Sequence, residues 1–281
     1  MHWLAEPFQY DFMLRALLAG ALAAVTCSLI GTWIVIRGMS FMGDALAHGV
    51  LPGIAIAFLL GIDITIGAVV AAVLMVLGIG FVNRSSRLSN DTGIGLLFVG
   101  MLALGVVLIS RTRSFTGDLT SFLFGTVLGV TDGDLWLQAV AVVITLIAVL
   151  ALHRMFLALS FNEEKAASLG LRPRFAHLAM LVLVSIAIVT SFRTVGTLLV
   201  FGLLVAPPAT AALLVRRVPS MMALACAIGL LSVVIGVEIT FHFDTAAGAT
   251  MAGTAVAMFF VVLTGRAIVQ WIVERRTPVA A

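Results

Sequence analysis

An aspartate and a histidine, Asp44 and His48, stand four residues apart in the stretch GDALAHGVLPG (43–53), between long apolar runs. Residues at this spacing share one face of a helix, so the carboxylate and the imidazole lie on the same side. Ionisable groups at bilayer depth are costly, and they usually face a polar cavity on a substrate path. Carboxylate oxygen and imidazole nitrogen are ligands for Zn²⁺ and Mn²⁺. The pair is a candidate metal site, a proton relay or a structural ion pair.

The residues around the pair predict an interrupted or tightly packed helix. Gly43, Gly49 and Gly53 permit close approach of neighbouring backbones, and Pro52 removes one intrahelical hydrogen bond. One helix supplies only two ligands, whereas two copies across a symmetry axis would supply four, which suits Zn²⁺ or Mn²⁺. We therefore expect a homodimer, or a pair with a close relative, with this span near the axis, where a cysteine at Gly43 or Ala47 would crosslink the subunits.

The elements that hold this pair are predicted to be membrane helices. Hydrophobic residues make up 62% of the 281-residue chain, charged residues only 10%, and the mean hydropathy is +1.21. A soluble domain needs more charge than this, and the apolar runs lack the alternation of barrel strands. We expect an all-α integral membrane protein, a polytopic bundle of about 8–9 transmembrane helices, forming a single transmembrane domain over residues 1–281. The net charge of +3 is scattered between apolar runs, so no nucleic-acid partner is expected.

Apolar runs long enough to span a bilayer, about 20 residues, recur along the chain. Two shorter or interrupted candidates are 41–60, which carries Asp44 and His48, and roughly 177–191. Residues 119–131 are free of charge but too short to span, which favours a re-entrant or interfacial piece. The charge-free runs of spanning length are 16–36, 64–82, 92–110, 135–152, 194–215, 218–237 and 245–265.

The distribution of basic residues predicts the orientation. With the N-terminus outside and about nine spans, most arginines fall on the inner side, as the positive-inside rule requires. The C-terminus is then cytoplasmic. The inner side carries Arg37, Arg84, Arg87, Arg154, Lys165, Arg172, Arg174, Arg216, Arg217, Arg266, Arg275 and Arg276, and the outer side Arg15, Arg111, Arg113 and Arg193.

The longest polar stretch, LSFNEEKAASLGLRPRF (159–175), lies on this inner side. It predicts a short helix with Asn162 as its N-cap, acidic residues in its first turn and Gly170 as its stop. Such a helix is either a solvated connector or a docking element for a cytoplasmic partner. The candidate docking residues are Asn162, Glu163, Glu164, Ala166, Ala167, Leu169 and Gly170.

Two further polar or helix-breaking groups are candidates for lesser roles. Glu238, His242 and Asp244 cluster near the predicted outer end of the eighth span, either as a solvated loop or as a vestibule that attracts a cation. Pro207 and Pro208 are predicted to end or kink their helix and to shape the pathway, as are Gly43 and Pro52.

The chain contains no nucleotide-binding or hydrolase motif. There is no G-x-x-x-x-G-K-[ST], and its single lysine, Lys165, is followed by Ala166. H-E-x-x-H and G-x-S-x-G are also absent. We therefore expect that the chain is no enzyme, and that energised work would depend on another subunit or on an ion gradient.

Five stretches resemble, in order, the motifs of permeases of the zinc/manganese/iron ABC-3 family. The segment 31–61 resembles the signature region, with its aspartate, its Ala-His pair and the following Leu-Pro-Gly. The others are the Leu-Phe-Gly segment (118–135), the cytoplasmic coupling segment (161–171), the Pro-Ala-Thr-Ala span (195–211) and the stretch FDTAAGAT (243–250).

The resemblance implies the permease subunit of an ATP-binding-cassette importer in the bacterial inner or plasma membrane. Two permeases would pair around a pathway for Zn²⁺ or Mn²⁺, with Asp44 and His48 as metal ligands and no permanently bound cofactor. Cytoplasmic ATPases would dock on 161–171, and an extracytoplasmic binding protein would deliver the metal. Asn162 replaces the family's usual aspartate, and Ala246 and Ala247 replace its usual Pro-Ser.

Two rival interpretations remain open on the residues alone. A proton-coupled secondary metal transporter would use Asp44 and His48 as a proton relay and would need no ATPase. A non-transporting membrane scaffold or enzyme subunit would leave the intramembrane pair without a role.

Overall fold

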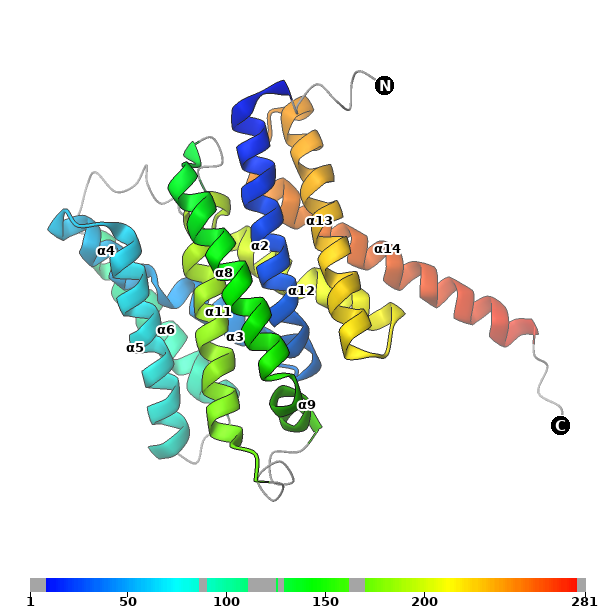
Figure 1. Ribbon diagram of the computed structural model, residues 1–281, viewed down its shortest axis with the longest axis horizontal. Helices are drawn as coiled ribbons and strands as arrows, with labels where there is room; N and C mark the ends of the chain where they lie inside the picture. The colour runs from blue at the N-terminus through cyan, green and yellow to red at the C-terminus, as the bar shows by residue number, and fades with distance from the viewer. Residues whose placement is uncertain (1–8, 86–89, 111–124, 126–128, 162–169, 277–281) are drawn as a thin grey trace.

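The computed structural model describes residues 9–85, 90–110, 125, 129–161 and 170–276, and these form a bundle of helices (Figure 1). Helices are expected in lipid because each backbone N–H and C=O must find its partner within its own segment. The helices are α2 (Asp11–Ile36), α3 (Ser40–Gly49), α4 (Leu51–Leu60), α5 (Ile64–Ser85), α6 (Asn90–Ser110), α8 (Asp132–Ala151), α9 (His153–Phe161), α11 (Pro173–Val195), α12 (Thr197–Leu214), α13 (Val218–Phe243) and α14 (Ala247–Arg276).

The predicted spans coincide with these helices. Seven of the described helical segments are long and apolar enough to cross a membrane, and two shorter apolar helices cover Thr92–Leu108 and Leu199–Leu214. The second span, Ser40–Leu60, is made of α3 and α4 together. The chain is therefore an all-α, multi-pass membrane protein, as predicted. Most of the predicted re-entrant piece, 119–131, lies outside the described residues.

The ends of the helices agree with the sidedness deduced from the arginines. Figure 1 shows that α2 and α8 begin at the end of the bundle where α13 finishes, while α9 and the start of α11 lie at the opposite end. An ion pair of 3.2 Å joins Arg15 of α2 to Asp132 at the start of α8. Thr131 and Asp134 form a capping box that fixes the first turn of α8. We refer to these two ends as outer and inner.

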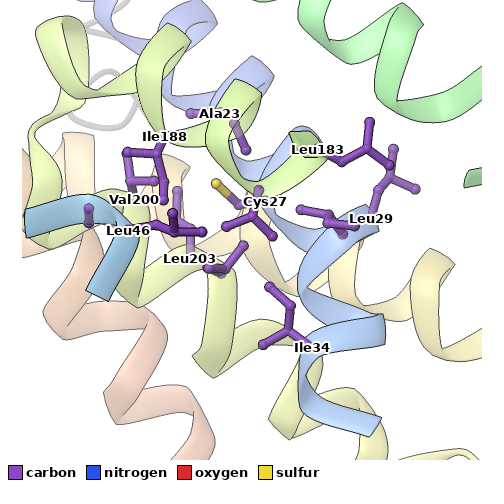
Figure 2. Close-up of a cluster of buried hydrophobic side chains, with 14 of the residues drawn as sticks. Ala23, Cys27, Leu29, Ile34, Leu46, Leu183, Ile188, Val200 and Leu203 are labelled. Atoms are coloured by element: carbon purple, nitrogen blue, oxygen red, sulfur yellow. The ribbon is translucent and has the colours of Figure 1, made fainter. Parts of the chain in front are cut away.

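Helix α2 forms the centre of the bundle. It packs against α8, α11, α12 and α13, and most of its residues are buried. Figure 2 shows side chains from the surrounding helices meeting around Cys27, among them Leu46, Ile188 and Leu203. A hydrogen bond also joins α2 to α13, in which Ser28 Oγ donates to the carbonyl of Ala225 at 3.2 Å.

Glycines set the closest helix crossings. A Cβ at Gly31 of α2 would lie 2.0 Å from the carbonyl oxygen of Leu204 on α12. At the crossing of α4 and α5, a Cβ at Gly53 would lie 2.1 Å from the carbonyl oxygen of Gly67, and the converse distance is also 2.1 Å. Backbones approach this closely only where no side chain intervenes, which is the usual role of small residues between membrane helices.

Helix α12 passes through both prolines predicted to end or kink it. Pro207 and Pro208 lie inside the helix, which continues to Leu214. Of the two predicted alternatives, an end or a kink, the structure excludes the end, because neighbouring membrane helices can enclose the backbone groups that a proline leaves without an intrahelical partner. Helix α14 extends away from the bundle (Figure 1), and its second half exposes apolar side chains such as Ile268 and Val269.

Candidate metal-binding site

Helix α3 carries Asp44 and His48 on the one face that its neighbours leave partly open. Of its ten residues, Met42, Gly43, Ala45, Leu46, Ala47 and Gly49 are buried. Asp44 and His48 are 28% and 23% exposed, and Phe41, three residues before Asp44, is exposed as well. The shared helical face predicted from the spacing is therefore present, and it is directed away from the core.

The two functional side chains lie against each other. His48 Nε2 is 3.4 Å from Asp44 Oδ1, slightly longer than a good hydrogen bond. Phe98 of α6 lies beside them, with its ring centroid 6.0 Å from that of His48 and 5.6 Å from that of Phe41. This aromatic wall keeps one side of the pair apolar.

Glycines on α3 fix the position of the pair by letting neighbouring helices come close. A Cβ at Gly43 would lie 2.4 Å from Leu204 Cδ2 on α12, and one at Gly49 would lie 3.2 Å from Met75 Cγ on α5. The predicted close packing at both glycines is present. Gly43 and Ala47 are buried within their own subunit, which argues against the predicted crosslinking of two subunits through a cysteine at either position.

A break in the span follows directly after His48. Helix α3 ends at Gly49, Val50 links it to α4, and Pro52 lies in the first turn of α4. Because proline has no N–H, it cannot donate to the carbonyl four residues earlier, which is that of His48. Gly105 of α6 packs against this break, since a Cβ there would lie 3.3 Å from the backbone nitrogen of Pro52. The predicted interruption is confirmed.

The ligand set is small within the described part of the chain. His48 Nδ1 is buried and has no hydrogen-bond partner among the described residues. In the same residues, no group of three or more His, Cys, Asp or Glu side chains comes together to hold a metal ion. Asp44 and His48 therefore offer one oxygen and one nitrogen, and a cation bound there needs ligands from water or from another chain.

The second polar group lies at the outer end of α13. Glu238 and His242 are 14% and 11% exposed, with His242 Nδ1 4.0 Å from Glu238 Oε2 and 3.0 Å from the Glu238 carbonyl oxygen. The two residues are therefore largely enclosed in the helix bundle. Asp244 is exposed beyond them, in the left-handed conformation that ends α13. The structure brings Glu238 and His242 together and leaves Asp244 outside the pair.

The predicted docking residues lie almost wholly outside the described residues. Asn162, Glu163, Glu164, Ala166, Ala167 and Leu169 belong to 162–169, and only Gly170 is described. Gly170 has φ +75°, a conformation that favours glycine. The flanking helices end at Phe161 and begin again at Pro173, at the inner end of the bundle.

Contacts from distant helices hold the site together, and the sequence analysis did not identify them. Leu204 of α12 contacts both α2 and α3 through Gly31 and Gly43, and Phe98 and Gly105 of α6 flank the pair and the break. In the sequence, these contacts were indicated by the recurrence of glycine inside apolar spans. Such glycines indicate that two helices pack closely, but they do not identify the neighbouring helix.

Together, these features define a class: an all-α, multi-pass membrane protein with an acid–histidine pair on an interrupted span. The profile of the ABC 3 transport family matches residues 9–266, and the chain belongs to this family. As a member, it is a multi-pass protein of the bacterial plasma membrane.

The chain is similar to several transport proteins along most of its length. It is 39% identical over 261 residues to the "Manganese transport system membrane protein MntC" of Listeria monocytogenes, which covers 93% of each chain. It is 37% identical to the "Chelated iron transport system membrane protein YfeD" of Yersinia pestis, over 92% of this chain and 86% of the relative. The solved structure of PsaBC from Streptococcus pneumoniae in complex with Fab superposes with a TM-score of 0.81 at 33% identity, over 93% of this chain and 94% of that chain.

Proposed function

We propose that the chain is the permease subunit of an ATP-binding-cassette importer for a divalent transition-metal cation. The observation that carries the proposal is the Asp44–His48 pair on the open face of α3, in a member of the ABC 3 transport family. Of the metals predicted from the ligand chemistry, Mn²⁺ is the cargo best supported, because relatives of high identity are named for manganese transport. Relatives named for iron make Fe²⁺ the next candidate, and the comparisons give no support specific to Zn²⁺.

The geometry of the pair supports a shared cation. Two atoms 3.4 Å apart, each bonded to one ion at about 2.1 Å, subtend about 110° at the ion, which is near a tetrahedral edge. A cation can therefore bind both side chains with little rearrangement. A few ligands from each subunit bind more weakly than a closed structural cage, and weak binding suits a site that must release its ion.

The ligand count also supports pairing of two permeases. The described part of one chain supplies an oxygen and a nitrogen at this site, whereas a four-coordinate cation needs twice that number. We propose a homodimer in which the open faces of two α3 helices meet across the pathway. Glu238 and His242, at the outer end of α13, would form a vestibule that attracts the cation after an extracytoplasmic binding protein delivers it.

Energy would come from a separate subunit. The sequence holds no P-loop, and we assign ATP hydrolysis to a cytoplasmic ATPase that docks on residues 161–171.

Pathway shaping is assigned to Gly43 and Pro52 at the site and to Pro207 and Pro208 in α12. The competing proposal, a proton-coupled secondary transporter, assigns the same pair to proton transfer.

Reconstitution into liposomes distinguishes these proposals. The permease is inserted alone or with the ATPase encoded beside it, and uptake of Mn²⁺, Fe²⁺ and Zn²⁺ is measured with the binding protein outside. We expect Mn²⁺ uptake only with the ATPase and ATP, and no response to an imposed pH gradient. Uptake by the permease alone, driven by the pH gradient, would instead establish the secondary transporter.

A further inference from the structure

The outer end of α13 repeats the residue pattern of the candidate metal site. Glu238 and His242 stand four residues apart, an acid followed by a histidine, as Asp44 and His48 do on α3. Side chains at this spacing lie on one face of a helix and can bind one metal ion together. We refer to Glu238 and His242 as the outer pair, and their surroundings decide whether this second copy of the pattern also suits a cation.

The outer pair lies at a different depth from Asp44 and His48. Helix α3 begins directly after the inner end of α2, and its two ligands lie about 6 and 12 Å along it at 1.5 Å per residue. Helix α13 also begins at the inner end (Figure 1), and the outer pair lies about 30 and 36 Å along it. One ion therefore cannot be shared between the two pairs, and the outer pair is a separate location near the outer surface.

One hydrogen bond fixes the ring nitrogen of His242 that can bind a cation. Nδ1 lies 3.0 Å from the carbonyl oxygen of Glu238. Because a carbonyl oxygen only accepts hydrogen bonds, Nδ1 carries the proton, and in the neutral ring Nε2 keeps its lone pair. Histidines that bind metals almost always donate their other N–H to a carbonyl, a carboxylate or water. His242 therefore has the tautomer and the support of a metal ligand.

The carboxylate of Glu238 is enclosed and is not neutralised by the histidine. The side chain is 14% exposed, and its Oε2 is buried and has no hydrogen-bond partner among the described residues. His242 Nδ1 is 4.0 Å from this oxygen, beyond hydrogen-bonding distance. Buried charges in proteins are paired or coordinate metals, since an isolated carboxylate is costly to remove from water. A cation bound between the carboxylate and Nε2 would remove this cost.

The rim around the outer pair carries negative charge. Asp244 follows the pair and is exposed. The ring of Tyr10, just before α2, lies 5.8 Å from that of Phe241, and the adjacent Asp11 is exposed. Arg15, one turn further along α2, is held by an ion pair to α8. A cation that approaches from outside therefore meets acidic groups first, which raises its local concentration.

We propose that the outer pair is a second binding site for a divalent transition-metal cation, which holds the ion on the outer side before it reaches Asp44 and His48. Glu238 supplies carboxylate oxygen, Nε2 of His242 supplies nitrogen, and water completes the coordination. The imidazole selects transition metals such as Mn²⁺ and Fe²⁺ over Ca²⁺ and Mg²⁺, which prefer ligand sets made of oxygen alone. The site extends the vestibule of the proposed function from attraction of a cation to its coordination, and it rests on that function in treating the ion as cargo.

Electron paramagnetic resonance of Mn²⁺ bound to the purified full-length permease tests the site. The double variant Asp44→Ala/His48→Ala is used, so that the first pair contributes no ligand. Loss of the signal of free Mn²⁺ measures binding, and electron spin echo envelope modulation detects a directly bound imidazole nitrogen. We expect saturable binding with a nitrogen coupling. Adding His242→Gln to the double variant should abolish the coupling and weaken binding at least about tenfold.

Two matched variants separate coordination from electrostatic attraction. Glu238→Gln and Asp244→Asn each remove one negative charge from the outer end of α13, in the double-variant background. Glu238→Gln should weaken Mn²⁺ binding at least about tenfold because it removes a ligand. Asp244→Asn should weaken it at most about threefold, as expected for an exposed and screened charge. Equal losses would show attraction alone and overturn the site.

The outcomes also keep this site apart from the proposed function. A double variant that binds no Mn²⁺, or binds it without a histidine nitrogen, overturns the site, while uptake by the wild type can still establish the importer. Binding at the outer pair in a protein that imports no metal supports the coordination and refutes the role of the ion as cargo. Thermal unfolding without metal checks that each variant is folded. Should the double variant not fold, His242→Gln in the otherwise wild-type chain must lower the number of Mn²⁺ ions bound per chain, and an unchanged number overturns the site.

Discussion

Asp44 and His48 are held in place by residues that themselves carry no charge. Phe98 borders the pair on α6, and Gly43 and Gly49 admit Leu204 and Met75 on the buried side of α3. The result is a carboxylate and an imidazole that are partly exposed on a helix whose other faces are buried. The positions of the two ligands therefore depend on the packing of α3 against its neighbours as much as the site depends on the chemistry of the ligands.

Replacement of either ligand should abolish transport. His48→Ala or Asp44→Ala removes one of two protein ligands, and we expect metal uptake to fall by at least about 100-fold, since loss of an outer-sphere partner alone costs about 10–100-fold. Uptake of radioactive manganese in a permease-deleted strain is the measurement. Phe41→Leu, on the same open face, is the control and should retain uptake. Normal uptake by correctly inserted His48→Ala would refute the assignment.

The crossing at Gly53 should tolerate no additional atom. In Gly53→Ala the new Cβ meets the carbonyl oxygen of Gly67 at 2.1 Å, and we expect a loss of about 1–3 kcal/mol. Gly80→Ala on α5 is the matched control, because nothing lies within 4 Å of its Cβ and alanine favours the helix. Thermal unfolding of both proteins in detergent gives the comparison, and an unchanged midpoint for Gly53→Ala would contradict the crossing.

At the scale of elements, the connection between α9 and α11 is the place where energy would enter. Helix α9 ends and α11 begins at the inner side of the bundle, and the end of α9 exposes Phe161, which is 84% accessible. Helix α11 passes from there past α3 and α12. A movement of the connection can therefore reach the helices that pack around Asp44 and His48.

A charge in this connection should uncouple the transporter. Ala167→Glu places a carboxylate among the small residues of 161–171 and should lower ATP-driven uptake while leaving metal binding intact. The permease is purified with its ATPase, and ATP hydrolysis and uptake are measured together. Ser220→Glu, an exposed position at the start of α13 on the same side, is the control. If Ala167→Glu binds the ATPase and transports at the wild-type rate, the segment is only a connector.

At the scale of the whole molecule, the partly open face of α3 and the small ligand set are the two observations behind the proposed pairing of two permeases. Phe41 is the exposed residue of α3 nearest to Asp44 along this face. A cysteine there should therefore replace the buried positions Gly43 and Ala47 as the crosslinking site.

Crosslinking from Phe41 tests the dimer directly. In a background without Cys27 and Cys226, Phe41→Cys should form a covalent dimer with a short bis-maleimide in native membranes. Ala47→Cys, which is 1% exposed, should not react and serves as the control. Full transport by a permease shown to be monomeric would overturn the proposed pairing.

The sequence by itself determined the class of fold, the apolar spans, the break after His48 and the helical face shared by Asp44 and His48. These properties are local, because a bilayer acts on each segment separately and requires about 20 apolar residues with internally satisfied backbone groups. Periodicity within one helix then fixes which residues lie on one side.

Only the tertiary structure decided where that side is directed. The polar residues Ser40, Asp44 and His48 mark one side of α3, but this pattern does not show which neighbouring helices cover the opposite side or leave the polar side open. The contact that covers Gly43 comes from Leu204 of α12, and the ring that borders the open face comes from Phe98 of α6, both far away in the sequence. Packing between helices also explains why α12 continues through Pro207 and Pro208. In a membrane span, neighbouring helices compensate for the hydrogen bond that a proline removes, and local sequence preference does not.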